Sequence, residues 1–113
     1  MMDITVDDLG RGRAALRLTG RLDLATAREL RSCVDDTVAA GSPNVVVDLS
    51  GVTSVDSSGL GALIGGLKRA NQAGGDLRIA APTDQVRMAL ELTNLIRVLH
   101  PYKTFDEALQ GLY

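Results

Sequence analysis

The chain has 113 residues, 12 of them basic and 14 acidic, which gives a formal net charge of −2. This length favours a single domain spanning residues 1–113, because two separate cores made from it would each be marginal. The sequence has no run of lysine and arginine, and its only aromatic residues are two tyrosines and one phenylalanine. It therefore lacks the basic surface and the stacking side chains expected of a nucleic-acid-binding protein.

The longest nearly uninterrupted apolar stretch, residues 59–67, is shorter than the roughly 17 to 25 residues that a helix needs to cross a bilayer. The acidic start MMDITVDDL is unlike a signal peptide, so we expect a cytoplasmic protein. The one cysteine, Cys33, fits a reducing compartment. Its place on the apolar face of a predicted helix favours a small core residue over a reactive thiol.

The first elements are predicted to be two strands and a helix. Residues 4–9 and 13–19 carry alternating and β-branched residues around a short glycine-rich turn, which predicts a β-hairpin. The stretch GRLDLATARELRSCVDDTVAAG has apolar residues at helical spacing and charged residues on the other face, which predicts an amphipathic helix. Thr26 and Glu29 have the spacing of a capping box at its start, and Gly41 supplies its C-terminal end.

The middle of the chain alternates strand and helix. PNVVVDLS is a short β-branched run, typical of a strand covered on both faces, so at least part of the sheet should be parallel or central. A second helix with a leucine and isoleucine stripe follows and ends around residues 71–75. Residues 76–80 predict another strand. Pro82 is predicted to open a third helix, because its fixed φ and missing N–H suit a first turn, and Asn94 can end it.

The last predicted elements are a short strand over residues 96–102 and a brief terminal helix. Thr104 and Glu107 repeat the capping-box spacing before that helix, and Gly111 closes it. The full order is ββαβαβαβα. Such an alternation predicts an α/β domain with a small mixed β-sheet flanked by helices.

Two serines, Ser57 and Ser58, stand between the central strand and the second helix. Serine is a preferred N-cap, worth about 1 kcal/mol, which explains one of the two hydroxyls. The start of a helix is also suited to an anion, since it carries roughly half a positive charge. Because Ser57 follows Asp56 in a loop and Gly59 leaves the backbone uncluttered, a phosphate on Ser57 would be tolerated without unfolding the helix. A cap and a modification site both remain open on these residues alone.

Sequence patterns of enzymes and cofactor sites are incomplete in this chain. Residues 61–66 imitate a phosphate-binding loop, but no lysine follows the last glycine directly, and Ile64 stands where a dinucleotide fingerprint needs its third glycine. Gly61 and Gly65, four residues apart, are better explained by close approach of that helix face to a neighbour.

Hydrolytic and metal chemistry are disfavoured by the same kind of test. The only histidine, His100, directly precedes a proline, and neither serine has a glycine two residues before it, as a nucleophile elbow requires. One histidine, one cysteine and scattered carboxylates match no metal-ligand spacing. We therefore expect a protein that is not an enzyme and that uses no cofactor and no metal.

Two segments resemble a known family when taken in order. LRLTGRLDLATARELRS and VVVDLSGVTSVDSSGLGALIGGLKRANQAGGDLRIAAPTDQVRMALELTNL are similar to the STAS domains of bacterial anti-sigma factor antagonists. The resemblance covers almost the whole chain, and D-S-S-G-L-G after a β-branched strand is its most specific element. It implies a small sheet flanked by helices, in agreement with the predicted order.

The resemblance implies a switch protein. In this family the unmodified domain binds an anti-sigma factor that is a serine kinase and so releases the sigma factor; phosphorylation by the kinase ends binding, and a serine phosphatase restores it. By position the resemblance assigns phosphorylation to Ser57, the loop aspartate to Asp23 and an apolar contact to Leu60, with Ser58 helping to cap the helix. The expected partner-binding residues are Asp23, Asp56, Ser57, Ser58, Gly59 and Leu60.

A second role for the same fold stays open. The chain is alternatively a non-enzymatic STAS subunit of a membrane lipid-transport complex or of a stress-sensing scaffold. Ser57 disfavours versions that lack a phosphorylated serine. Copurified partners separate the two roles, because the first predicts a soluble kinase-like protein and the second a transporter ATPase. Neither role involves nucleic acid or direct membrane insertion.

Overall fold

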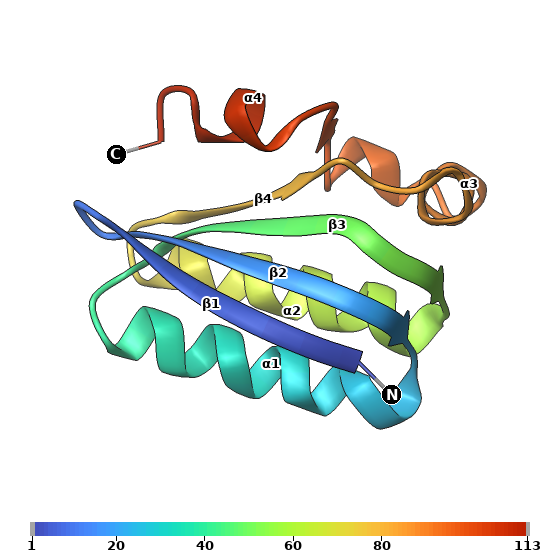
Figure 1. Ribbon diagram of the computed structural model, residues 1–113, viewed down its shortest axis with the longest axis horizontal. Helices are drawn as coiled ribbons and strands as arrows, with labels where there is room; N and C mark the ends of the chain where they lie inside the picture. The colour runs from blue at the N-terminus through green and yellow to red at the C-terminus, as the bar shows by residue number, and fades with distance from the viewer. Residues whose placement is uncertain (1, 113) are drawn as a thin grey trace.

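The computed structural model describes residues 2–112, which fold into one layered α/β unit (Figure 1). The elements in chain order are β1 (Met2–Gly10), β2 (Arg13–Leu22), α1 (Leu24–Ala39), β3 (Asn44–Val55), α2 (Ser57–Gln72), β4 (Asp76–Ala80), α3 (Asp84–Leu92), the 3₁₀ helix η1 (Leu95–Arg97), β5 (Pro101–Tyr102) and α4 (Phe105–Leu109). The predicted order is confirmed, and η1 is the one described element that the sequence did not predict.

The five strands lie side by side in the order β1-β2-β3-β4-β5. β1 and β2 form the predicted antiparallel hairpin, whereas β2, β3, β4 and β5 run parallel to one another. The β-branched strand β3 therefore occupies the centre of the sheet, as its continuous apolar run predicted. Parallel neighbours place the starts of their following helices at one end of the sheet, and this arrangement positions the candidate site.

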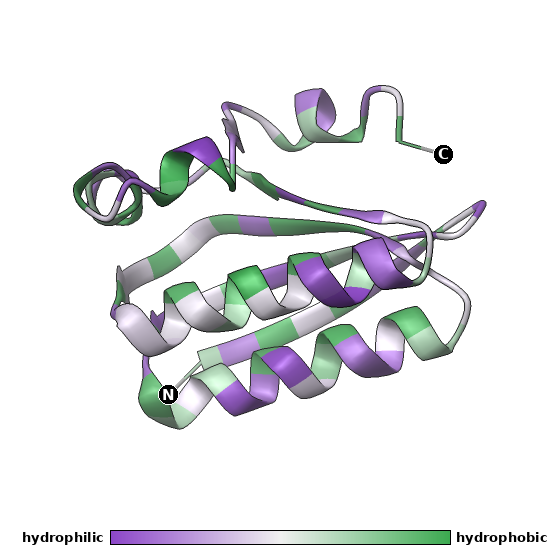
Figure 2. Cartoon of the chain, turned by 180° about the vertical axis from the view of Figure 1, so that it is seen from behind, coloured by the Kyte–Doolittle hydropathy of each residue, from purple (hydrophilic) through white to green (hydrophobic). Residues whose placement is uncertain are grey.

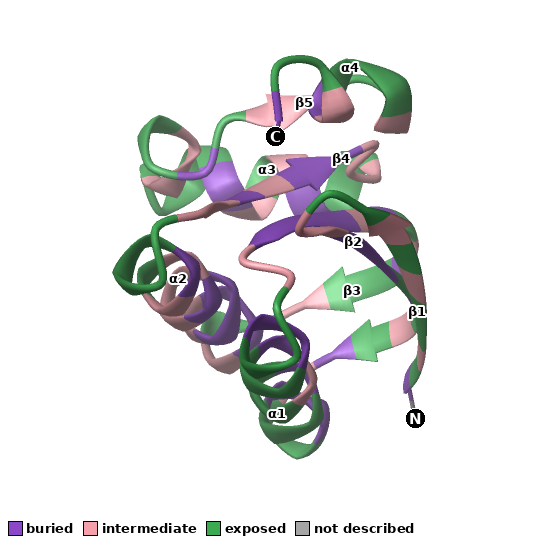
Figure 3. Ribbon diagram, turned by 90° about the vertical axis from the view of Figure 1, so that its left-hand side faces the viewer, coloured by how far each residue is buried: buried purple, intermediate pink, exposed green. Residues whose placement is uncertain are grey.

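The two long helices, α1 and α2, lie next to each other on one face of the sheet (Figures 1 and 3). Alternation along β3 explains the layers: Val45 and Val47 are fully buried in the cluster that includes the apolar faces of α1 and α2, whereas Val46 points to the opposite face and packs in a smaller cluster with Ala108 of α4. In Figure 2, hydrophilic and hydrophobic residues alternate along α1, as its amphipathic sequence predicted.

Two helix starts differ from the sequence prediction. Asp23, not Thr26, is the N-cap of α1, and the capping box joins Asp23 to Thr26 in place of Thr26 to Glu29. The third helix begins at Asp84 with Thr83 as its N-cap, so Pro82 lies ahead of the helix and does not open it. In both cases the true N-cap has a side-chain oxygen that accepts a hydrogen bond from the amide three residues later. Sequence spacing alone did not distinguish this residue from the predicted helix start.

The predicted strand over residues 96–102 is mostly wrong. Asn94 adopts a left-handed conformation, with φ of 63°, and the chain then turns through η1. Only Pro101 and Tyr102 pair with β4. The terminal helix α4 follows as predicted, and the Thr104 side chain caps it by accepting a hydrogen bond from the amide of Glu107 at 3.1 Å.

Candidate functional site

The candidate site lies where two parallel strands end beside each other. Leu22 at the end of β2 pairs with Val55 at the end of β3. Each strand is followed by a single aspartate, Asp23 or Asp56, and then directly by a helix. The amide of Asp56 donates a hydrogen bond to the carbonyl of Leu22 at 3.2 Å, which holds the two strand-to-helix turns together. The starts of α1 and α2 therefore face solvent at the same end of the sheet.

Asp23 is fixed by reciprocal hydrogen bonds at the start of α1. Its carboxylate accepts from the amides of Ala25 at 3.1 Å and Thr26 at 3.2 Å, while the Thr26 hydroxyl oxygen accepts from the Asp23 amide at 2.9 Å. These bonds favour the ionised form, and the bond from the Thr26 amide is the main reason that the pKa of Asp23 is lowered. Asp23 is thus a charged cap at the surface where α1 begins.

Asp56 caps the second helix, which releases both serines from that role. The Asp56 carboxylate accepts a hydrogen bond from the Gly59 amide at 3.0 Å. Ser57 is exposed and Ser58 is half-buried, and within residues 2–112 neither hydroxyl forms a hydrogen bond to another protein group. The expectation that Ser58 caps α2 is therefore wrong.

Gly59 and Leu60 are buried, and the structure corrects their expected place in a contact surface. A Cβ atom on Gly59 would collide with the carbonyl oxygen of Leu22 and lie 2.7 Å from the Leu22 Cγ. Glycine is therefore required by close packing of α2 on the end of β2. Leu60 is only 4% exposed and belongs to the main core, which does not fit the apolar contact that the resemblance assigned to it.

The residues of α1 that face the two serines were not predicted from the sequence. A cavity of about 270 Å³ lies between the starts of the helices, lined by Leu24, Arg28 and Arg31 of α1 and by Ser57, Ser58 and Gly61 of α2. Leu24 is 71% exposed. A leucine on the hydrophilic face of an amphipathic helix was the available signal, but its nearness to the serines follows only from the pairing of β2 with β3.

Cys33 lies away from this site. It is half-buried and packs against the main core, in agreement with the predicted structural role. Burial raises the pKa of its thiol, which disfavours the reactive thiolate.

Two further properties concern residues 2–112 as a whole. None of the helices there combines the length and the apolar composition that spanning a membrane requires. Those residues also contain no group of three histidine, cysteine or carboxylate side chains arranged to hold a metal ion.

Comparison with known proteins agrees with the fold and with the resemblance. Residues 6–108 match the STAS domain family. The chain is 30% identical over 103 residues to an anti-sigma F factor antagonist of Paenibacillus polymyxa, covering 90% of this chain and 88% of the relative.

Solved structures with the same fold include an anti-sigma factor antagonist from Mycobacterium paratuberculosis, with a TM-score of 0.86, 27% identity and coverage of 99% of this chain and 94% of the other. A second is the Bacillus cell fate determinant SpoIIAA in its phosphorylated form, with a TM-score of 0.72, 19% identity and coverage of 95% and 96%. From the family match and the 30% identical relative, we conclude that the chain belongs to the STAS domain family, and that its similar relatives are anti-sigma factor antagonists.

Proposed function

We propose that this chain is an anti-sigma factor antagonist of the cytoplasm that binds an anti-sigma factor with serine kinase activity. Binding in the unmodified state frees the sigma factor for transcription. The kinase then transfers the γ-phosphoryl group of ATP to the Oγ atom of Ser57, with ADP as the leaving group and loss of the hydroxyl proton. A serine phosphatase returns the protein to the binding state.

The observation that carries this proposal is the cap at the start of α2. The Asp56 carboxylate already satisfies the Gly59 amide, so Ser57 is not needed as a cap; it is also exposed, and its hydroxyl forms no hydrogen bond within the described residues. A phosphate there meets the positive end of the helix dipole, so the folded chain tolerates it. Ser58 is less accessible, which favours Ser57 as the phosphorylated residue. SpoIIAA in its phosphorylated form has the same fold, which supports the view that this fold tolerates a phosphate group.

The surface around Ser57 has the composition of a small protein-binding site. Asp23 and Asp56 provide two carboxylates at the adjacent helix starts, and Leu24 provides an exposed apolar side chain in the same cavity region. An exposed leucine beside fixed charges can serve as an anchor when a partner excludes water around it. A phosphate on Ser57 adds a charge of about −1.5 to −2 near Asp56, which opposes desolvation by the partner. Gly59 and Leu60 contribute by packing, not by contact.

The test is phosphate incorporation followed by mass spectrometry, with candidate anti-sigma kinases and ATP. We expect one phosphate on the wild type and on Ser58→Ala, and none on Ser57→Ala. Calorimetric titration of the same proteins should show that Ser57→Ala still binds the kinase, while the phosphorylated wild type does not. Phosphate on Ser58 in the Ser57→Ala variant would overturn the choice of serine. Absence of both binding and labelling, with recovery of a transporter ATPase as the copurified partner, would overturn the proposed function.

A further inference from the structure

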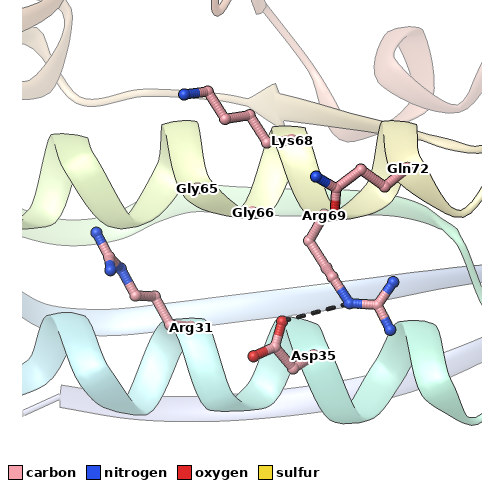
Figure 4. A pocket seen from close by; sticks show the side chains of 7 residues that line it. All are labelled: Arg31, Asp35, Gly65, Gly66, Lys68, Arg69 and Gln72. Atoms are coloured by element: carbon pink, nitrogen blue, oxygen red, sulfur yellow. Dashed lines mark ion pairs between the residues drawn. The ribbon is translucent and has the colours of Figure 1, made fainter.

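Two cavities form a groove between α1 and α2, and Arg31 lines both of them. The cavity that contains the serines includes Arg31, and so does a second cavity of about 290 Å³ farther along the same two helices (Figure 4). In the second cavity, the carboxylate of Asp35 pairs with Arg69 at 3.6 Å. Figure 4 shows Asp35 turned toward Arg69, while Arg31 reaches from α1 toward α2.

Glycines of α2 position the Arg31 side chain. A Cβ atom on Gly61 would lie 3.7 Å from an Nη atom of Arg31, and one on Gly65 would lie 3.8 Å from its Nε atom. The guanidinium therefore rests against the glycine face of α2, which was predicted from the sequence to lie close to a neighbouring element. Within residues 2–112 no carboxylate forms an ion pair with Arg31, in contrast to Arg69. A guanidinium held in this way retains its hydrogen-bond donors for another acceptor.

The same face of α2 carries the phosphorylation site of the proposed function. Ser57 and Gly61 are four residues apart on the helix, so their Cβ positions are separated by about 5–6 Å. The Arg31 guanidinium is in van der Waals contact range of the Gly61 position. A phosphoryl group extends the serine side chain by two further bonds, toward a cavity that both Ser57 and Arg31 line. The extended side chain can therefore reach Arg31, and a charge-assisted hydrogen bond between a guanidinium nitrogen and a phosphate oxygen has a length of about 2.7–2.9 Å.

We infer that Arg31 is the internal receptor for a phosphoryl group on Ser57, so that the modified side chain folds into the groove between α1 and α2. This inference rests on the proposed function for the identity of the modified residue. The planar guanidinium of arginine can form two parallel hydrogen bonds to a phosphate group, a geometry that lysine does not reproduce. The phosphate then has two effects: it forms stabilising contacts within the chain, and its charge opposes binding of the partner. Arg28 lines the same cavity but has no glycine face beneath it.

The experiment uses the full chain with phosphoserine incorporated genetically at position 57, so that no kinase is required. The ³¹P NMR signal is followed as pH is raised through the second ionisation of the phosphate, which lies near 6 for phosphoserine. We expect the titration midpoint to lie lower in the otherwise unchanged chain than in Arg31→Gln, by several tenths of a pH unit, because the guanidinium stabilises the dianion. Thermal melting should show that phosphoserine raises the midpoint temperature of unfolding, and that Arg31→Gln removes most of this gain.

Two matched variants define the controls. Arg97→Gln removes an exposed arginine of η1 that lines neither cavity, and it should leave the phosphate titration unchanged. Arg28→Gln tests the other arginine near the serines. Equal titrations in the unchanged chain and in Arg31→Gln would overturn the inference, and a shift caused by Arg28→Gln alone would reassign the receptor. Either result leaves the proposed function standing, because that function is tested separately by kinase labelling of Ser57.

Discussion

Asp23 and Asp56 occupy equivalent positions on adjacent parallel strands, each as the single residue between a strand end and the first turn of a helix. Each carboxylate accepts a hydrogen bond from the amide three residues later, at 3.2 Å from Thr26 and 3.0 Å from Gly59. The two caps thus bring the starts of α1 and α2 to one surface. The cap at Asp56 also leaves the two serines that follow it without a capping role.

Leu24 and Leu60 provide a matched pair, because one is exposed and the other is buried. Leu60→Ala should lower the free energy of unfolding by about 2–5 kcal/mol, as expected for a core leucine. Leu24→Ala should change it by about 0.5 kcal/mol or less, as an exposed substitution, yet weaken binding to the kinase partner at least tenfold. Chemical denaturation and calorimetric titration measure the two effects. Normal partner affinity in Leu24→Ala would remove this leucine from the binding surface.

Gly59 and Gly61 lie in the first turns of α2 and should respond oppositely to alanine. Gly59→Ala places a methyl group against the Leu22 carbonyl, a backbone atom that cannot move aside easily. We expect a loss of about 1–3 kcal/mol in the free energy of unfolding, as for other overpacked positions.

Gly61→Ala is the control for that substitution. The nearest atom to its Cβ is on the flexible Arg31 side chain at 3.7 Å, an ordinary contact distance. Alanine should therefore raise the free energy of unfolding by about 0.5–1 kcal/mol through better helix propensity. Urea unfolding of both variants gives the comparison, and equal destabilisation of the two would contradict the packing assigned to Gly59.

The cap at Asp23 predicts a pH dependence of stability. Because its pKa is lower in the folded chain than in the unfolded chain, the ionised carboxylate stabilises the fold at pH values above the unfolded pKa of about 3.9. That contribution is lost as pH falls through the lower, folded pKa. Asp23→Asn keeps a capping oxygen but does not titrate. The stability advantage of wild type over Asp23→Asn should therefore shrink between neutral pH and about pH 3, as measured by denaturant unfolding at each pH. A constant difference would show that the charge of Asp23 does not contribute.

Charge at Ser57 should separate folding from binding. Ser57→Asp adds a carboxylate in the first turn of α2, where the dipole favours it by about 0.3–1 kcal/mol, so the melting temperature should stay the same or rise. Affinity for the kinase partner should fall, because the new charge lies beside Asp56 and must be desolvated when the partner binds. Ser58→Asp serves as the control and should weaken binding less. The reverse order of the two affinities would exchange the roles assigned to the serines.

Local patterns predicted the hairpin from alternating residues, the central strand from a continuous apolar run, and the two long helices from apolar residues at helical spacing. They failed where two local signals competed. The D-x-x-T spacing of Asp23 and Thr26 and the T-x-x-E spacing of Thr26 and Glu29 both suit a helix start, and only the end of β2 at Leu22 decides between them. Residues 96–102 contain β-branched and aliphatic side chains, but the left-handed Asn94 directs the chain into a turn.

The sequence predicted only the part of the candidate site whose residues are neighbours in the chain. Ser57 and Asp56 are neighbours in sequence, so their shared location at a helix start follows from the strand before them. Leu24 and Arg31 reach the same cavity from α1, more than twenty-five residues away in the chain. No periodicity within α1 reveals that contact, because it depends on the parallel pairing of β2 with β3.

The two borders of the sheet differ in how they resist unwanted association. At one border, β5 has only two residues and begins with Pro101, which lacks the amide that a further strand would need. At the other border, β1 is nine residues long and carries exposed Asp3 and Asp8. Two copies approaching through β1 would bring like charges together. The unpaired backbone groups at both borders are therefore poor templates for the addition of a further strand.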